Sequence, residues 1–251
     1  MGKIIVFANQ KGGVGKTTTA VNLGAYIADA GKKTLLVDFD PQGNLSSSLG
    51  LDKKKPGIYE VLSGKAEIED VIQKTPVENL SAVAANINLT GANIELVDQE
   101  DKEYYLKKII EKIKNNYDYI FIDSPPSLGI LTLNGLVAAD HVIIPLQCEY
   151  FALEGLTLLV QTIAGIQREL NKKLSIGGIV FTMYDTRTNL ANEVVKNVTG
   201  YFREKVFRTV IPRNVALSEA PSHGLPISIY RDDSTGARSY KKLSEEVINR
   251  V

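Results

Sequence analysis

A glycine-rich run near the start of the chain constrains its fold more than any other segment. The run Lys-Gly-Gly-Val-Gly-Lys-Thr-Thr occupies residues 11–18, between an apolar stretch at 3–8 that predicts a buried strand and a helical pattern at 18–28. Glycines between a strand and a helix let successive backbone N–H groups turn toward an anion, and the helix N-terminus adds partial positive charge. The run therefore predicts a loop that binds nucleotide phosphates, with Lys16 on the terminal phosphates and the Thr17 hydroxyl on Mg²⁺.

This loop departs from the general phosphate-binding pattern at one position. Gln10 stands where the first glycine is expected, and a second lysine, Lys11, follows it. The form resembles the deviant Walker A motif of the ParA/MinD superfamily, which implies that Lys11 acts on the nucleotide of a partner subunit. The alternative is a tight turn with Lys11 as a solvated charge. The residues expected to bind nucleotide are Lys11, Gly12, Gly13, Val14, Gly15, Lys16, Thr17 and Thr18, and both lysines are expected to be catalytic.

Short apolar segments alternate with helical patterns along most of the chain. Strand candidates lie at 3–8, 34–39, 80–84, 119–123, 141–146, 176–183, 206–211 and 227–230, and helical patterns include 101–115 and 153–170. Strands that are apolar on both faces indicate a mostly parallel sheet with helices on each side. We therefore expect an α/β fold in one domain over residues 1–251, with a twisted sheet of about seven or eight strands. The resemblance to the ParA/MinD superfamily implies that this fold is of the P-loop NTPase (SIMIBI) type.

Aspartates follow or end two of these strand candidates. Asp38 and Asp40 are two residues apart, so in an extended chain they point the same way, beside the phosphate loop. Asp123 ends an apolar segment, as in a Walker B motif, and a buried carboxylate there needs a cation such as Mg²⁺. The superfamily pattern implies that Asp40 orients the attacking water and that Asp38 lies near the metal. The alternatives are a polar turn at Asp40 and a capping role for Asp123. The expected metal site comprises Thr17, Asp38 and Asp123.

The resemblance covers essentially the full length of the chain. The runs at 40–44, 148–155, 187–190 and 211–224 are similar to those of the chromosomal ParA (Soj) partition family. In that family Pro212 would flank the adenine ring and Asn214 would hydrogen-bond its edge, although the Pro-Arg-Asn spacing alone indicates only a turn. The resemblance implies an ATP-hydrolysing enzyme that uses Mg²⁺ and forms an ATP-dependent sandwich homodimer. It also implies binding to double-stranded DNA without sequence preference and a ParB-type partner that stimulates hydrolysis.

Contacts to DNA are expected from the C-terminal part of the chain. The formal net charge is zero, so attraction to nucleic acid has to come from a local patch. Ala216 stands where the family commonly has a basic residue. Either other residues form the DNA surface in this chain, or its non-specific DNA binding is weaker. Ala216→Arg is therefore expected to strengthen DNA binding. The resemblance favours Arg187 as a DNA contact, and the further candidates are Arg208, Arg238, Lys241 and Lys242.

Composition excludes one related class and leaves others open. One cysteine, Cys148, cannot supply the two ligands per subunit that an iron–sulfur protein of the nitrogenase reductase type needs. Without a charged-then-apolar leader or a long apolar run, we expect a cytoplasmic protein with no membrane partner, and the resemblance implies association with the nucleoid. A MinD-like membrane-cycling ATPase is an alternative, although residues 243–251 carry two adjacent acids where lipid binding needs a basic amphipathic helix. A second alternative is a DNA-binding scaffold that is controlled by nucleotide and whose ATP hydrolysis is incidental.

Overall fold

A mostly parallel sheet forms the centre of the molecule. The computed structural model describes residues 2–96 and 98–251, and these residues form a seven-stranded sheet in the order β3-β4-β2-β5-β1-β6-β7. β3 runs antiparallel to β4, and every other neighbouring pair is parallel. The strands are β1 (Lys3–Phe7), β2 (Thr34–Asp38), β3 (Ile72–Lys74), β4 (Leu80–Val83), β5 (Tyr119–Asp123), β6 (His141–Gln147) and β7 (Ser175–Thr182). The expected α/β fold is confirmed.

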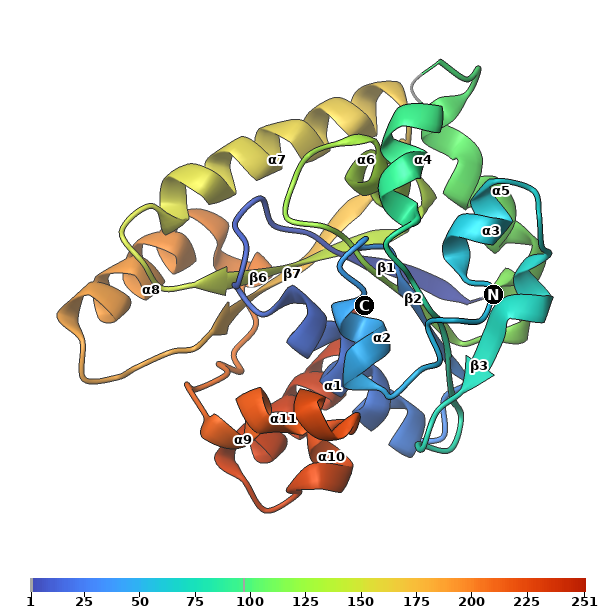
Figure 1. Ribbon diagram of the computed structural model, residues 1–251. Coiled ribbons are helices and arrows are strands. Elements are labelled where there is room, and N and C mark those ends of the chain that lie inside the picture. Colours follow the sequence, from blue (N-terminus) through green and yellow to red (C-terminus); the bar gives the residue numbers. More distant parts are fainter. Residues whose placement is uncertain (1, 97) are drawn as a thin grey trace.

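Helices cover both faces of the sheet (Figure 1). One layer contains α3 (Ile58–Leu62), α4 (Leu89–Glu95), α5 (Tyr105–Ile113), α6 (Ile130–Ala138), α7 (Ala152–Glu169) and α8 (Asn189–Phe202). The other contains α1 (Lys16–Asp29), α2 (Asn44–Ser48), α9 (Val215–Glu219), α10 (Ile227–Tyr230) and α11 (Thr235–Arg250). No helix within the described residues is both long and apolar enough to cross a membrane.

The central strands β1, β2 and β5 are apolar along most of their length because both of their faces are buried. On β1, Ile4 and Val6 pack into the cluster under α3–α8, whereas Ile5 and Phe7 pack into the cluster under α1 and α11. Successive side chains of a strand point to opposite faces, so a sheet with helices on both sides needs an apolar residue at every position. The same arrangement leaves the carboxyl ends of the parallel strands free to carry polar residues.

Residues 206–211, which come after α8, lie beside β7 but do not form a strand. This corrects the prediction of a strand at 206–211. The segment bonds to β7 through the backbone N–H groups of Phe207 and Ile211, at 2.9 and 2.8 Å. Between them, the carboxylate of Glu246 on α11 accepts from the backbone N–H groups at 208–209, at 2.7 and 3.1 Å. A side chain from the C-terminal helix therefore takes the donors that a continuous strand ladder would use.

Two other segments also differ from the sequence prediction. Residues 227–230, expected as a strand, form the single helical turn α10, in which Tyr230 N donates to Pro226 O at 3.0 Å. A run of four mostly apolar residues is too short to distinguish a buried strand from a buried helical turn by pattern. The short strand β3 was not expected, because its sequence Ile-Gln-Lys carries no apolar run and only its pairing with β4 makes it a strand.

Candidate functional site

The glycine-rich loop turns sharply between β1 and α1. Gly13 and Gly15 have φ values of 72° and 85°, a left-handed region in which a side chain would be strained. Gly15 is the N-cap of α1, so no side chain caps the first turn and its backbone N–H groups can receive an anion. The first helical residue is Lys16. The loop therefore has the shape of a phosphate cradle, as its sequence predicts.

Lys16 is held inside this loop with little exposure to solvent. Its ammonium donates to the backbone carbonyls of Asn9 and Lys11, at 3.1 and 3.2 Å. Burial lowers the pKa of Lys16, while the nearby carboxylates of Asp123 and Asp40 act in the opposite direction. A buried cation next to an anion cradle is stabilised by any phosphate that enters, so the arrangement favours binding of polyphosphate.

Asp123 is fully buried at the end of β5, and one of its oxygens is unpaired. Its Oδ2 accepts a hydrogen bond from Thr17 Oγ1 at 2.6 Å, whereas Oδ1 has no partner among the described residues. Burial raises the pKa of Asp123 well above its ordinary value and the neighbouring Asp38 raises it further, while the Thr17 bond lowers it. An unpaired carboxylate oxygen at such a place costs free energy unless a cation compensates it. Thr17 and Asp123 thus offer the hard oxygen atoms that suit Mg²⁺.

Asp38 is also fully buried, but both of its oxygens are engaged. Its Oδ2 accepts from the backbone N and the Oγ of Ser46, at 2.8 and 2.6 Å, and its Oδ1 accepts from Asp40 N at 3.3 Å. Ser46 Oγ in turn accepts from Ala85 N at 2.9 Å. Burial raises the pKa of Asp38 to about 6, against the lowering effect of the Ser46 bonds. Asp38 therefore joins the start of α2 to the end of β4, and it does not line the cavity described next.

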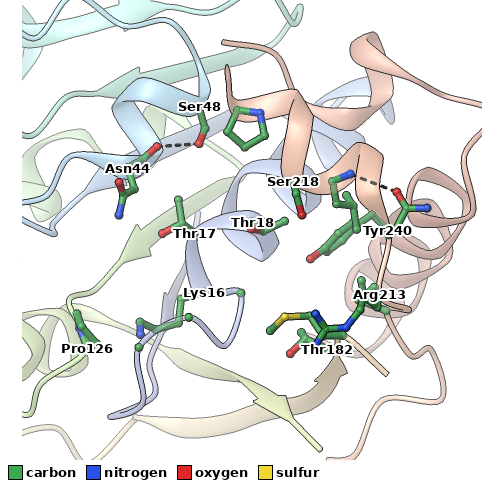
Figure 2. Close-up of a pocket in the computed structure, with 18 of the residues that line it drawn as sticks. Lys16, Thr17, Thr18, Asn44, Ser48, Pro126, Thr182, Arg213, Ser218 and Tyr240 are labelled. Atoms are coloured by element: carbon green, nitrogen blue, oxygen red, sulfur yellow. Dashed lines mark hydrogen bonds between the residues drawn. The ribbon is translucent and has the colours of Figure 1, made fainter. Parts of the chain in front are cut away.

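A cavity of about 570 Å³ opens above the loop. Figure 2 shows Lys16, Thr17 and Thr18 in its middle, Asn44 and Ser48 toward one side, and Ser218 and Tyr240 toward the other. Asp40 lines the cavity, as do Gly12, Gly13, Gly15 and Pro126. The lining that the C-terminal part of the chain contributes includes the apolar residues Ile211, Pro212 and Leu217 and the polar residues Asn214 and Ser218. The cavity thus combines a phosphate loop with both apolar and hydrogen-bonding side chains.

Pro212 and Asn214, which the sequence analysis expected at the nucleotide, both line this cavity. Asn214 is the N-cap of α9, where its Oδ1 accepts from Leu217 N at 3.2 Å and its Nδ2 donates to Thr235 Oγ1 at 2.9 Å. The sequence reasoning missed Thr182 and Tyr240, which also line the cavity. Thr182 Oγ1 donates to Val14 O at 2.8 Å. These two residues lie more than 150 positions from the loop, so no local sequence signal could have found them.

Lys11 lies outside the cavity lining. Its ammonium forms an ion pair with Glu149, just before α7, and about half of each side chain is exposed. Its backbone N donates to Asn9 Oδ1 at 3.0 Å, which fixes the start of the loop. Within one subunit, Lys11 and Lys16 therefore have different surroundings, the first partly solvated and ion-paired and the second buried beside the carboxylates.

The five candidate DNA residues are exposed and lie on three separate segments. Arg187 precedes α8, Arg208 lies in the segment after β7, and Arg238, Lys241 and Lys242 lie on α11. The side chain of Arg187 is 85% exposed and forms a two-pronged ion pair with Asp185, at 2.6 and 2.9 Å. Arg238 donates to Asp233 O at 2.8 Å.

Ala216 is buried, which changes the expectation for Ala216→Arg. Only 4% of this residue is exposed, and it packs in the core beside α1 and α11. A guanidinium there would have to displace core residues before it reached solvent. A gain in DNA binding from this substitution is therefore not a clean test of the DNA surface, because the substitution also perturbs the packing of α9.

Comparison with known proteins supports one family along the whole chain. A family model described as an AAA domain matches residues 2–176. The chromosome-partitioning ATPase Soj of Treponema pallidum is 67% identical over 250 residues, covering 100% of this chain and 98% of that protein. The sporulation initiation inhibitor protein Soj of Bacillus subtilis is 55% identical and covers 98% of each chain.

A solved structure agrees in fold and adds a ligand. The cobyrinic acid a,c-diamide synthase of Mycobacterium smegmatis, solved with ADP and magnesium, has a TM-score of 0.87 and 37% identity over 99% of this chain and 95% of that one. The phosphate loop, the buried aspartates and the full-length similarity lead to the same assignment. The chain belongs to the Soj/ParA family of chromosome-partitioning ATPases.

Proposed function

We propose that the cavity binds ATP with Mg²⁺ and hydrolyses it, and that the whole chain acts as one partition ATPase domain. The observation that carries this proposal is the unpaired Oδ1 of Asp123, buried beside Thr17 below the phosphate loop. Thr17 and Asp123 would hold Mg²⁺, which supplies charge stabilisation at the phosphates during transfer to water. The nucleotide and metal bound in the mycobacterial structure, ADP and magnesium, support the same assignment.

The residues of the loop and of β2 have separate tasks in this proposal. Lys16 neutralises the terminal phosphates, and Asp40, which lines the cavity, orients the attacking water. Asp38 was expected near the metal, but its oxygens are engaged by Ser46 and Asp40 N. We therefore assign to Asp38 the task of holding the Asp40 segment in place.

Lys11 supports the proposal that two subunits form one active unit. In a single chain it pairs with Glu149 and lies outside its own cavity, so it remains available to a second subunit. An ATP-dependent sandwich dimer would bring each Lys11 to the partner's nucleotide. Pairing of two modest basic surfaces on one duplex would then make DNA binding nucleotide-dependent, with a ParB-type partner stimulating hydrolysis at the nucleoid.

The MinD-like alternative is weakened by the packing of the last helix. Tyr240, Leu243 and Val247 of α11 are buried in the cluster that contains α1, and Tyr240 OH hydrogen-bonds Thr19 Oγ1 at 3.1 Å. The apolar face that would have to insert into lipid is therefore used inside the protein. The scaffold alternative differs from the proposed function only in turnover, so steady-state ATP hydrolysis with and without DNA separates the two.

Lys16→Ala and Lys11→Ala should have different effects, because one lysine serves its own subunit and the other its partner. Lys16→Ala should abolish ATP binding. Lys11→Ala should bind ATP nearly as the parent does, yet lose both the ATP-dependent dimer and hydrolysis. Calorimetry measures the first property and size exclusion with light scattering the second. Lys112→Ala is the control, since Lys112 is also exposed and ion-paired, to Glu67. A Lys11→Ala protein that dimerises and hydrolyses ATP normally would contradict the trans assignment.

Asp40→Ala should leave ATP bound and let the dimer accumulate, while turnover falls by roughly 10²-fold because a positioned catalytic group is lost. Asp38→Asn should lower kcat with little change in KM, because it disturbs the position of Asp40 without removing a contact to the nucleotide. Steady-state kinetics in Mg²⁺ measures both. Normal turnover in Asp40→Ala, or failure of that variant to bind ATP, would remove Asp40 from the catalytic residues.

Arg187→Ala should weaken binding to duplex DNA in the presence of ATP without changing ATP affinity. When a protein binds DNA phosphates, the logarithm of the association constant falls linearly as log[salt] rises, with a slope of about −0.9 per phosphate neutralised. Loss of one contact should therefore make this slope shallower by about one unit. Filter binding over a salt series measures the slope. Arg168→Ala is the control, because Arg168 is a similarly exposed arginine paired with the adjacent acid Glu169. Equal slopes for Arg187→Ala and the parent would exclude Arg187 from the DNA surface.

A further inference from the structure

Ser46 is a fully buried serine of α2 that does not line the nucleotide cavity, although other residues of that helix do. Its hydroxyl is used in both directions. Ser46 Oγ donates to Asp38 Oδ2 at 2.6 Å and accepts from Ala85 N at 2.9 Å. A serine hydroxyl has a single proton to donate, so these two bonds together fix its orientation. The hydroxyl therefore joins the carboxylate at the end of β2 to the backbone that follows β4.

Asp38 connects this hydroxyl to the turn that contains Asp40. Its Oδ2 also accepts from Ser46 N at 2.8 Å, and its Oδ1 accepts from Asp40 N at 3.3 Å. The N–H of Phe39 still bonds to the sheet, donating to Asp123 O at 2.9 Å, whereas the N–H of Asp40 bonds to a side chain. A distance of 3.3 Å is long for an amide donor, so a small displacement of the carboxylate would break this bond.

Ala85, two residues after the end of β4, also contacts the turn directly. Gly43, the N-cap of α2, has a φ of 62°, and a Cβ added to it would lie 3.0 Å from Ala85 O. Gly43 N donates to Asp40 O at 2.9 Å, and Gln42 N donates to Asp40 Oδ1 at 3.0 Å, which closes the turn. Ala85 thus meets this part of the chain twice, through its carbonyl at Gly43 and through its N–H at Ser46.

We propose that Ser46 is a positioning residue for hydrolysis, an inference that rests on the proposed role of Asp40 in orienting the attacking water. Ser46→Ala would leave Asp38 Oδ2 with its backbone bond alone and would remove the acceptor of Ala85 N. The carboxylate would then be free to shift, and the backbone of Asp40 would shift with it. Displacement of a positioned group by about 1 Å lowers a rate by up to about 10²-fold.

Steady-state hydrolysis with Mg²⁺ and calorimetric titration of ATP test this inference. Ser46→Ala should lower kcat about 10-fold and leave KM within about twofold of the parent, because Ser46 does not line the cavity. The calorimetric stoichiometry should match that of the parent, which shows that the loss is not due to an inactive fraction. Ser46→Cys, whose thiol is a weak donor, should also lower kcat, and it carries the same test if Ser46→Ala does not fold.

Ser244→Ala is the matched control, because it removes the hydroxyl of another buried serine that is not connected to Asp38. Ser244 is 3% exposed, and its hydroxyl donates to Lys241 O at 2.7 Å within α11. This variant should keep the kcat and the KM of the parent. Parent-like kcat in the folded Ser46 variants would overturn the inference, and so would a loss of kcat/KM that comes entirely from a higher KM.

A double-mutant cycle with Asp40→Ala separates positioning from general damage. If Ser46 acts through Asp40, adding Ser46→Ala to Asp40→Ala should change the residual kcat by less than about twofold. An equal loss in both backgrounds would overturn the inference, because damage that bypasses Asp40 adds to the loss of Asp40. Parent-like kcat in Asp40→Ala contradicts the proposed function itself, whereas a slow Asp40→Ala with a normal Ser46→Ala contradicts the role of Ser46 alone.

Discussion

The buried carboxylate of Asp123 is the interaction on which the rest of the site depends. β5 lies between β1 and β2, and the strand register pairs Asp123 with Phe7 on one side and with Asp38 on the other. Two aspartates are thereby fixed side by side in a water-excluded position. Burial raises the pKa of both carboxyl groups, and a neighbouring carboxylate raises each further, Asp40 for Asp38 and Asp38 for Asp123. The Lys16 ammonium opposes this rise at Asp123, and the hydrogen bonds from Ser46 oppose it at Asp38.

The two aspartates differ in how the protein satisfies them. Ser46 and the Asp40 backbone N–H occupy the oxygens of Asp38, whereas one oxygen of Asp123 has no partner within residues 2–96 and 98–251. An unpaired buried carboxylate oxygen is costly in the absence of a ligand and favourable when a hard cation is present. This difference is why we assign the metal to Thr17 and Asp123 and a positioning task to Asp38. Binding and catalysis are thus separated between two neighbouring strand ends.

The C-terminal part of the chain completes the cavity from the other side. α11 packs against α1, and the hydroxyl of Tyr240 meets Thr19 one turn into α1. Glu246 of the same helix draws the segment after β7 out of strand geometry, and that segment leads directly into the cavity residues Ile211 and Pro212. The cavity therefore depends on contacts across very different sequence separations, 221 residues between Thr19 and Tyr240 and 37 or 38 residues between Glu246 and the backbone at 208–209.

The sequence pattern correctly predicted those elements whose backbone is determined by neighbouring residues. Six of the strand candidates, the helix after the loop and the phosphate-loop geometry follow from apolar runs and glycine spacing. The strand predictions for 206–211 and 227–230 were wrong for two different reasons. Glu246, which accepts hydrogen bonds from the backbone at 208–209, lies 37 or 38 residues away, outside any short window. The run at 227–230 is too short for its pattern to distinguish a strand from the helical turn that it forms.

The most direct test of the central claim is the gain in ATP affinity that Mg²⁺ provides. Calorimetric titration of ATP in Mg²⁺ and in EDTA, for the parent and for Asp123→Asn, measures this gain. In the parent, Mg²⁺ should tighten ATP binding. In Asp123→Asn the gain should shrink by about 10-fold or more, because a neutral amide replaces the carboxylate oxygen that faces the metal, while binding in EDTA should be retained. An equal Mg²⁺ gain in both proteins would contradict the assignment of the metal to Asp123.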